Sequence, residues 1–262
     1  MGADFIRDER IHPYLWLALA SLILAPVFAR GLPCSDDTLT HLYRVVQLDL
    51  NLRQGAPFLV WSPDLLRGYG YPIFGFYAPF TYWLIETLHL LGLDFAPAIR
   101  LAFFTAPLLA GWGMYTWAAR WSSRPAACVS ALAYMFAPYL LYDTVSRGAL
   151  PSALALCILP WALAACADAQ RKRTPPSVVL AAVAFSILNL THNVAPIFGI
   201  ALALGLSLIP DDSSAPASPL RTRFWSALNG MWPTVAALLL ALALTAFFWS
   251  LNWVIGRAMV GE

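Results

Sequence analysis

The chain has 262 residues, of which 60% are hydrophobic and 11% are charged, and its formal net charge is +2. A soluble domain of this length cannot bury so much apolar surface, so the composition excludes a soluble globular protein and indicates an integral membrane protein. The few basic residues are spread over short loops, which argues against a nucleic-acid-binding surface.

Several apolar stretches approach the roughly 20 residues that cross a bilayer as a helix. They are Tyr14 to Ala29, Ala96 to Ala119, Ala126 to Leu141, Leu150 to Ala167 and Met231 to Leu251. No small-residue cleavage site follows the first stretch, so we expect a retained helix and not a signal peptide. Between Arg173 and Arg221 a further apolar stretch is broken by Thr191-His192-Asn193, which predicts a helical hairpin.

Basic clusters in short loops set the orientation, because such loops stay in the cytoplasm during insertion. The clusters are Arg7 with Arg10, Arg120 with Arg124, Arg171-Lys172-Arg173, and Arg221 with Arg223. The chain must cross the bilayer an even number of times between any two of them. We therefore predict about seven spans, a cytoplasmic N-terminus, an external C-terminus and an external turn at Tyr142 to Ala149. Eight spans with one basic loop misplaced is the alternative.

The stretch from Ile73 to Gly92 would violate this parity if it crossed the membrane. It contains Pro79 and Glu86 and is rich in aromatic residues that favour the membrane interface. We therefore predict a helix lying at, or dipping into, the outer membrane surface. The predicted fold is an all-α polytopic transmembrane helix bundle, a single module over residues 1–262 with juxtamembrane helices in a large first external loop at about 30–95.

Within that loop, Thr38 to Arg53 has the pattern of an amphipathic helix. Its apolar side carries Leu39, Tyr43, Val46 and Leu50, and its polar side carries Asp37, His41, Arg44 and Asn51. We expect the apolar side to rest on lipid or on the bundle, and the polar side to face a cavity.

The charged groups of the external region suggest chemistry on a lipid-borne substrate. Asp37 can act as a general base on an acceptor hydroxyl or help to hold a divalent metal ion. Asp36 has the same chemistry, but it or Ser35 could instead cap the helix. Arg147, and with weaker support Arg44, could bind a donor phosphate through paired hydrogen bonds.

Each further candidate has a structural alternative. Arg147 could form an ion pair with Asp143 or extend toward the membrane interface. Tyr69 lies in a segment rich in glycine, proline and aromatic residues and could stack on a sugar ring, although interface anchoring explains it equally well. The four cysteines, Cys34, Cys128, Cys157 and Cys166, have neither a disulfide framework nor a paired metal-binding spacing.

Five segments of the chain together resemble a known family. They are DDTLTHLYR at 36–44, WSPDLLRGYGYPIFGFYAPFTYWL at 61–84, YDTVSRGALPSALALCILPW at 142–161, LTHN at 190–193 and AFFWSLNW at 246–253. The sequence resembles bacterial membrane proteins of the 6-pyruvoyl-tetrahydropterin synthase-related family, whose architecture is similar to that of GT-C glycosyltransferases. The pterin-binding and zinc-binding residues of the soluble synthase are not visible in the sequence.

The resemblance implies a catalytic acidic residue in the first external loop, which Asp37 (or Asp36) matches. It implies a second acidic residue in the later external turn, where Asp143 lies. It also implies a Pro-Glu pair after the arginine of that turn, whereas Pro151 here is followed by Ser152. Around the substrate we expect His41, Arg44, Asp143, Arg147, Tyr69 and His192. Relatives usually continue beyond the last apolar stretch, so a fragment, a truncated homologue and a minimal module are all open.

The predicted function is sugar transfer from a polyprenyl-phosphate donor at the external face of the bacterial inner membrane. The expected partners are membrane lipids and that donor, without nucleic acid, and a divalent metal ion is a candidate cofactor. A transporter or flippase of lipid-linked precursors and a non-catalytic scaffold are the alternatives. Ion-driven transporters place ionisable residues near mid-membrane, whereas the charged residues here lie at span ends and in loops.

Overall fold

The structure is a computed structural model that describes residues 12–28, 31–32, 35–56, 60–209 and 228–260. Within these ranges the chain is helical, and its β-structure is limited to one isolated bridge between Ser62 and Tyr71. The helices are α2 (His12–Phe28), α3 (Thr38–Arg53), α4 (Ile73–Phe76), α5 (Phe80–Leu90), α6 (Phe95–Ala118), α7 (Arg124–Met135), α8 (Pro138–Leu141), the π-helix η1 (Tyr142–Arg147), α9 (Leu150–Lys172), α10 (Pro175–Thr191), α11 (Ala195–Ser207), α13 (Trp232–Leu244) and α14 (Ala246–Val260). The predicted all-α helix bundle is confirmed.

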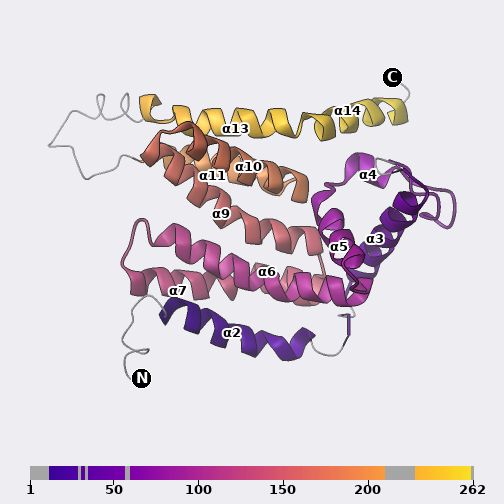
Figure 1. Cartoon of the computed structure of the whole chain (residues 1–262), viewed down its shortest axis with the longest axis horizontal. Coiled ribbons are helices and arrows are strands. Elements are labelled where there is room, and N and C mark those ends of the chain that lie inside the picture. Colours follow the sequence, from indigo (N-terminus) through magenta and orange to yellow (C-terminus); the bar gives the residue numbers. More distant parts are fainter. Residues whose placement is uncertain (1–11, 29–30, 33–34, 57–59, 210–227, 261–262) are drawn as a thin grey trace.

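The long helices lie side by side, and the short polar helices gather at one end of them (Figure 1). α6 packs against α7 and α9, and α10 packs against α9 and α13. We call the end that carries α3, α4 and α5 the site end. We call the opposite end, where Arg120–Arg124 and Arg171–Arg173 lie, the basic end.

Three helical segments of the described chain are long and apolar enough to cross a membrane: Phe95–Ala118, Arg124–Arg147 and Leu150–Lys172. Together, α13 and α14 would make a fourth span if they are counted as one, bent by 55°. α10 and α11 are shorter apolar helices. The number of about seven spans therefore stays a prediction. That prediction rests in part on the basic clusters, and four of their residues lie outside the described part of the chain: Arg7, Arg10, Arg221 and Arg223.

Three stretches that were predicted to be continuous are interrupted in the structure. Pro79 separates α4 from α5, and Pro138 separates α7 from α8, because proline disfavours helical backbone in the residue before it. Between α13 and α14, the Thr245 hydroxyl donates to the carbonyl of Ala241 at 2.9 Å. Such a bond from a side chain to the preceding turn bends helices.

The predicted surface helix is α5, and other helices of the protein pack against it. α5 has 11 residues, which at about 1.5 Å per residue is too short to cross a bilayer. It packs against α3, α6 and α10, and its residues Tyr82, Ile85 and Glu86 are 0% exposed. α5 is therefore too short to be a span of its own, one side of it is buried in the protein, and Thr87 and Leu90 at its end are exposed; its place at the outer membrane surface stays a prediction.

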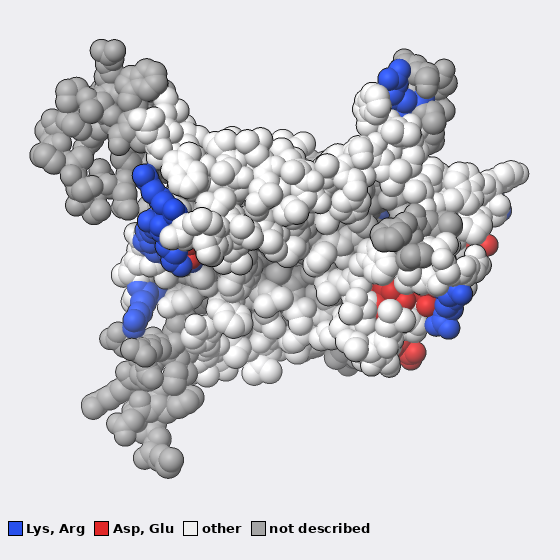
Figure 2. Space-filling view, turned by 45° about the horizontal axis from the view of Figure 1, so that its top comes forward, with Lys and Arg blue, Asp and Glu red and all other residues white. Residues whose placement is uncertain are grey.

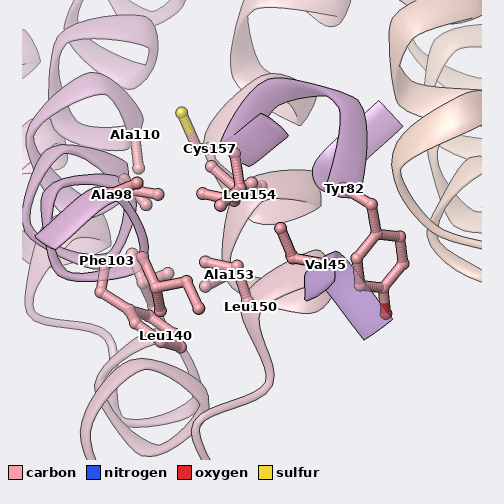
Figure 3. Packing of buried hydrophobic residues seen from close by; sticks show 14 of the residues in the cluster. Val45, Tyr82, Ala98, Phe103, Ala110, Leu140, Leu150, Ala153, Leu154 and Cys157 are labelled. Carbon is pink, nitrogen blue, oxygen red and sulfur yellow. The ribbon is translucent and has the colours of Figure 1, made fainter. Parts of the chain in front are cut away.

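The two larger of three apolar cores among the described residues hold most of these elements together. The core in Figure 3 contains Val45 of α3, Tyr82 of α5, Phe103 of α6, Leu140 of α8 and Leu154 of α9. This core fixes the site-end helices to the candidate spans. The second core joins α9, α10, α11 and α13 through small side chains such as Ala162, Ala181, Ala203 and Ala237. Small residues allow helices to approach closely where lipid removes the usual hydrophobic driving force.

Candidate functional site

A π-helix and the glycine after it bring an arginine against the start of α3. η1 ends at Arg147, and Gly148 follows with a φ of +68°. A side chain at position 148 would collide with the hydroxyl oxygens of Ser35 and Thr38. This close approach lets the Asp37 N–H donate to the Arg147 carbonyl at 2.9 Å. Glycine is therefore required both for the backbone conformation and for the contact.

Arg147 lies between two carboxylates. Its Nε is 3.2 Å from a carboxylate oxygen of Asp37, and its Nη1 is 3.5 Å from one of Asp143. The Asp143 side chain is fully buried, whereas those of Arg147 and Asp37 are 43% and 38% exposed. The guanidinium thus has one inner carboxylate that holds it and one outer carboxylate that a ligand can reach.

Asp37 does not use its side chain to cap α3. It occupies the N-cap position but makes no side-chain capping hydrogen bond, since its carboxylate pairs with Arg147. The neighbouring Asp36 is exposed. Of the two acidic candidates in this loop, the structure brings Asp37 and not Asp36 into the arginine site.

Ser152 completes the inner side of the site. Its hydroxyl donates a short hydrogen bond to the Asp143 carboxylate. The Asp143 backbone carbonyl also accepts from the Ala149 N–H at 2.8 Å. The serine that stands where the family resemblance implies glutamate therefore still contacts the buried carboxylate, although it adds no second negative charge.

A second cluster joins α3 to α5 through Tyr82. The Arg44 guanidinium donates to the Tyr82 hydroxyl at 3.0 Å and lies 4.4 Å above the Tyr77 ring. The Tyr82 oxygen lies 2.9 Å from Nδ1 of His41. The direction of the bond between Tyr82 and His41 depends on which ring nitrogen of His41 carries the proton.

His41 is a neutral buried histidine. It is 2% exposed, and burial together with the positive charges of Arg44 and Arg147 lowers its pKa to about 3. Burial also raises the pKa of Tyr82. Both groups are therefore neutral near pH 7, and their contribution is to orient Arg44 and to connect α3 with α5.

The polar side of α3 faces the protein and its apolar side faces outward, which corrects the expectation of a polar side open to a cavity. Leu39 and Tyr43 are 56% and 57% exposed. In the second half of the helix, the Gln47 amide donates to the Asp64 carboxylate at 2.8 Å, and the Asn51 amide donates to the Trp61 carbonyl at 3.3 Å. These polar residues hold the loop over 61–71 and are not available to a ligand.

His192 lies at the break between α10 and α11. Its Nδ1 accepts from the N–H groups of Val194 and Ala195 at 3.0 and 3.1 Å, so the ring proton resides on Nε2. Burial lowers the pKa of His192. The negative charge of Asp143 raises this pKa and the positive charge of Arg147 lowers it, each by less than burial does. The charges of Asp143 and Arg147 in the arginine site therefore contribute to the pKa of His192 at the α10–α11 break.

Asn193 fastens this break to the segment before α5. Its side-chain oxygen accepts from the Ala78 N–H at 2.9 Å, and its amide donates to the Phe76 carbonyl through a short hydrogen bond. The site end is therefore assembled from the first loop, the η1 turn and the α10–α11 break.

Tyr69 lies apart from these clusters. It is 87% exposed on the loop closed by the pair of backbone hydrogen bonds between Ser62 and Tyr71. Among the described residues, no hydrogen bond or ring contact joins its side chain to Arg147 or Arg44. Gly70 is packed against the Trp61 ring, so the loop has a fixed shape while its tip is open to the surroundings.

The candidate divalent metal ion finds no suitable ligand set in the described part of the chain. No group of three or more His, Cys, Asp or Glu side chains is positioned to hold one within those ranges. The two carboxylates nearest to each other in the site are both paired with Arg147.

Comparison with known proteins places the chain in a family. No curated protein and no solved structure matches it. Residues 74–251 match a family described as a 6-pyruvoyl-tetrahydropterin synthase related domain and as a membrane protein. The matched region includes Tyr82, Asp143, Arg147 and His192, and it begins after α3. The chain therefore belongs to the 6-pyruvoyl-tetrahydropterin synthase-related family of membrane proteins.

Proposed function

We propose that this chain transfers a sugar from a polyprenyl-phosphate donor to an acceptor hydroxyl at the external face of the bacterial inner membrane. The observation that supports this proposal is the Asp37–Arg147–Asp143 group at the end of a bundle of apolar helices. The chain of a lipid-linked donor lies in the bilayer, so its phosphate stays at the membrane surface. The partly exposed guanidinium of Arg147 at that level can bind the donor phosphate, because guanidinium binds phosphate through two parallel hydrogen bonds.

In this mechanism, the donor phosphate competes with Asp37 for Arg147. The released Asp37 carboxylate accepts the proton of the acceptor hydroxyl as a general base. The acceptor oxygen forms a bond to the anomeric carbon of the sugar while the bond between that carbon and the phosphate oxygen breaks. Polyprenyl phosphate leaves with the bonding electrons, and Arg147 stabilises the charge that develops on it. Asp143 acts through Arg147 by keeping the guanidinium in place.

The remaining candidates have supporting roles in this proposal. His192 carries its proton on Nε2 and can donate a hydrogen bond to the phosphate or the sugar. Arg44, oriented by Tyr82 and His41, contributes a second positive charge near the donor. Tyr69 offers an exposed ring on which a sugar can stack.

Replacing Asp37 by Asn tests the proposal directly. Removal of the base is expected to lower sugar transfer in proteoliposomes by at least about a hundredfold. The matched control is Asp36→Asn, which removes an equal charge from the adjacent exposed residue and should leave transfer unchanged. Equal activity of the Asp37→Asn variant and the unmodified chain, with both folded, would reject the catalytic role of Asp37.

One observation favours transport of a lipid-linked precursor as a second candidate. The bend between α13 and α14 lies beside the buried Asn189, whose amide donates to Thr245 at 3.4 Å and whose side-chain oxygen has no hydrogen-bond partner in the described part of the chain. Transporters often place binding sites at broken helices. A lipid-flipping assay on the Asp37→Asn variant separates the two candidates, because a flippase would retain its activity without a general base.

A further inference from the structure

The basic end carries an excess of positive charge that the described part of the chain does not neutralise. Blue side chains gather there with little red beside them, in contrast to the mixed colours at the other end (Figure 2). The Arg120 guanidinium forms two hydrogen bonds of 2.8 Å with the Asp168 carboxylate. Lys172 lies 3.9 Å from the same carboxylate with its side chain 64% exposed. One carboxylate is therefore shared by two cations.

The run at the end of α9 presents its charges in a fixed arrangement. The Arg171 guanidinium donates to the Arg120 carbonyl at 2.9 Å and lies 4.8 Å from the centre of the Trp121 ring. Arg173 has a φ of +50°, which ends the helix and turns the chain, and it is exposed like Arg171 and Lys172. Positive side chains favour a helix C-terminus, but that effect alone does not require a guanidinium held over an indole ring.

An apolar pocket adjoins this cluster and shares a residue with it. The pocket lies among α6, α9 and α11 and is lined in part by Trp117, Trp121, Leu163 and Leu206. Trp121 therefore borders the pocket and also carries the Arg171 guanidinium on its ring. Tryptophan prefers the headgroup level of a bilayer, so we expect Trp121 and the basic cluster beside it to lie at that level.

We propose that the basic end binds one anionic phospholipid, with its phosphate against Arg171, Lys172 and Arg173 and its acyl chains along the outer surface that exposes Trp121, Val179 and Leu180. A ligand that combines a negative headgroup with apolar chains matches the basic cluster and this apolar surface at once. Basic pockets between membrane helices bind such headgroups. This site lies at the opposite end from the proposed sugar-transfer site and does not depend on it.

Thermal unfolding of the purified full chain in neutral detergent tests the proposal by titration with phosphatidylglycerol. The unmodified chain should be stabilised by phosphatidylglycerol and not by phosphatidylcholine. In the K172Q/R173Q variant the apparent Kd for phosphatidylglycerol should rise by about tenfold. The matched control is R53Q/R67Q, which removes the same charge from the site end and should bind the lipid as the unmodified chain does.

Three outcomes would overturn the assignment. An equal loss of lipid binding in both double variants would mean diffuse charge attraction without a specific site. Equal stabilisation by glycerol phosphate or inorganic phosphate would mean a phosphate site without a lipid. Unchanged binding in the folded K172Q/R173Q variant would place the lipid elsewhere. Native mass spectrometry should count one fewer bound phosphatidylglycerol on that variant.

Discussion

The two ends of the bundle differ in the partners that they give to their basic side chains. At the site end, Arg147 has two carboxylate partners, and Arg44 is enclosed by Tyr77 and Tyr82. At the basic end, Asp168 is the carboxylate that Arg120 and Lys172 share within the described residues. Arg147 thus has more carboxylate partners than either of these two cations. Two partners suit a side chain that must hold a defined geometry, whereas a shared partner leaves positive charge for orientation and lipid contact.

The largest expected effect is an all-or-none difference in labelling between the ends. In a chain carrying Cys34→Ser, we expect Tyr69→Cys to react with a membrane-impermeant maleimide added outside cells. Lys172→Cys should react only after the membrane is permeabilised. Both positions are exposed, and Cys157 and Cys166 are buried, so background labelling should be small once the partly exposed Cys128 is also replaced by Ser. The opposite labelling pattern would invert the predicted orientation.

Gly148→Ala should destabilise the site end by about 3 kcal/mol, because it combines an unfavourable backbone conformation with overpacking. The expected consequence is a lower unfolding temperature and a loss of sugar transfer. Gly55→Ala is the control for backbone conformation alone, since Gly55 has a φ of +76° but nothing within 4 Å of an added Cβ. Equal effects of the two substitutions would show that contact with Ser35 and Thr38 is unimportant.

Acidic pH should weaken the site end through His41. The unfolded chain takes up a proton near the ordinary pKa of 6.5, whereas the folded chain resists protonation down to about 3. The stabilising effect of the neutral imidazole is therefore complete above pH 6.5 and is lost as the pH falls below it. The expected loss is about 1.4 kcal/mol per pH unit, or about 2 kcal/mol at pH 5. Unfolding temperatures measured from pH 7 to pH 5 should fall less steeply in His41→Asn.

The helices of this protein were more predictable than their contacts. Apolar runs predicted α6 and α9, and apolar residues at helical spacing predicted α3 over Thr38 to Arg53. The spacing left open whether the apolar side of α3 meets lipid or the bundle, and the polar side was wrongly expected to face a cavity, because periodicity separates two sides of a helix without saying which is buried. In a membrane-bound chain, Leu39 and Tyr43 can face lipid while His41 and Asn51 face the protein.

The arginine site was only partly foreseeable. Asp37, Asp143 and Arg147 were candidates from residue type and resemblance, and the structure brings them together. Tyr82 was missed, since it lies in an aromatic run where nothing distinguishes it from its neighbours. Its contacts with His41 and Arg44 depend on the packing of α5 against α3, which are separated in the sequence by the loop over 61–71.

The π-helix η1 makes the position of Arg147 tolerant of a one-residue change in chain length. A π-helix bonds to the fifth residue and thereby accommodates one residue more than an α-helical turn. Deletion of one residue within Tyr142–Arg147 would restore α-helical bonding and leave the side chains at its end on nearly the same face, whereas the same deletion in a regular α-helix rotates them by about 100° about the axis. In relatives, a one-residue gap in this segment would therefore mark chains that hold the arginine in the same place without a π-helix.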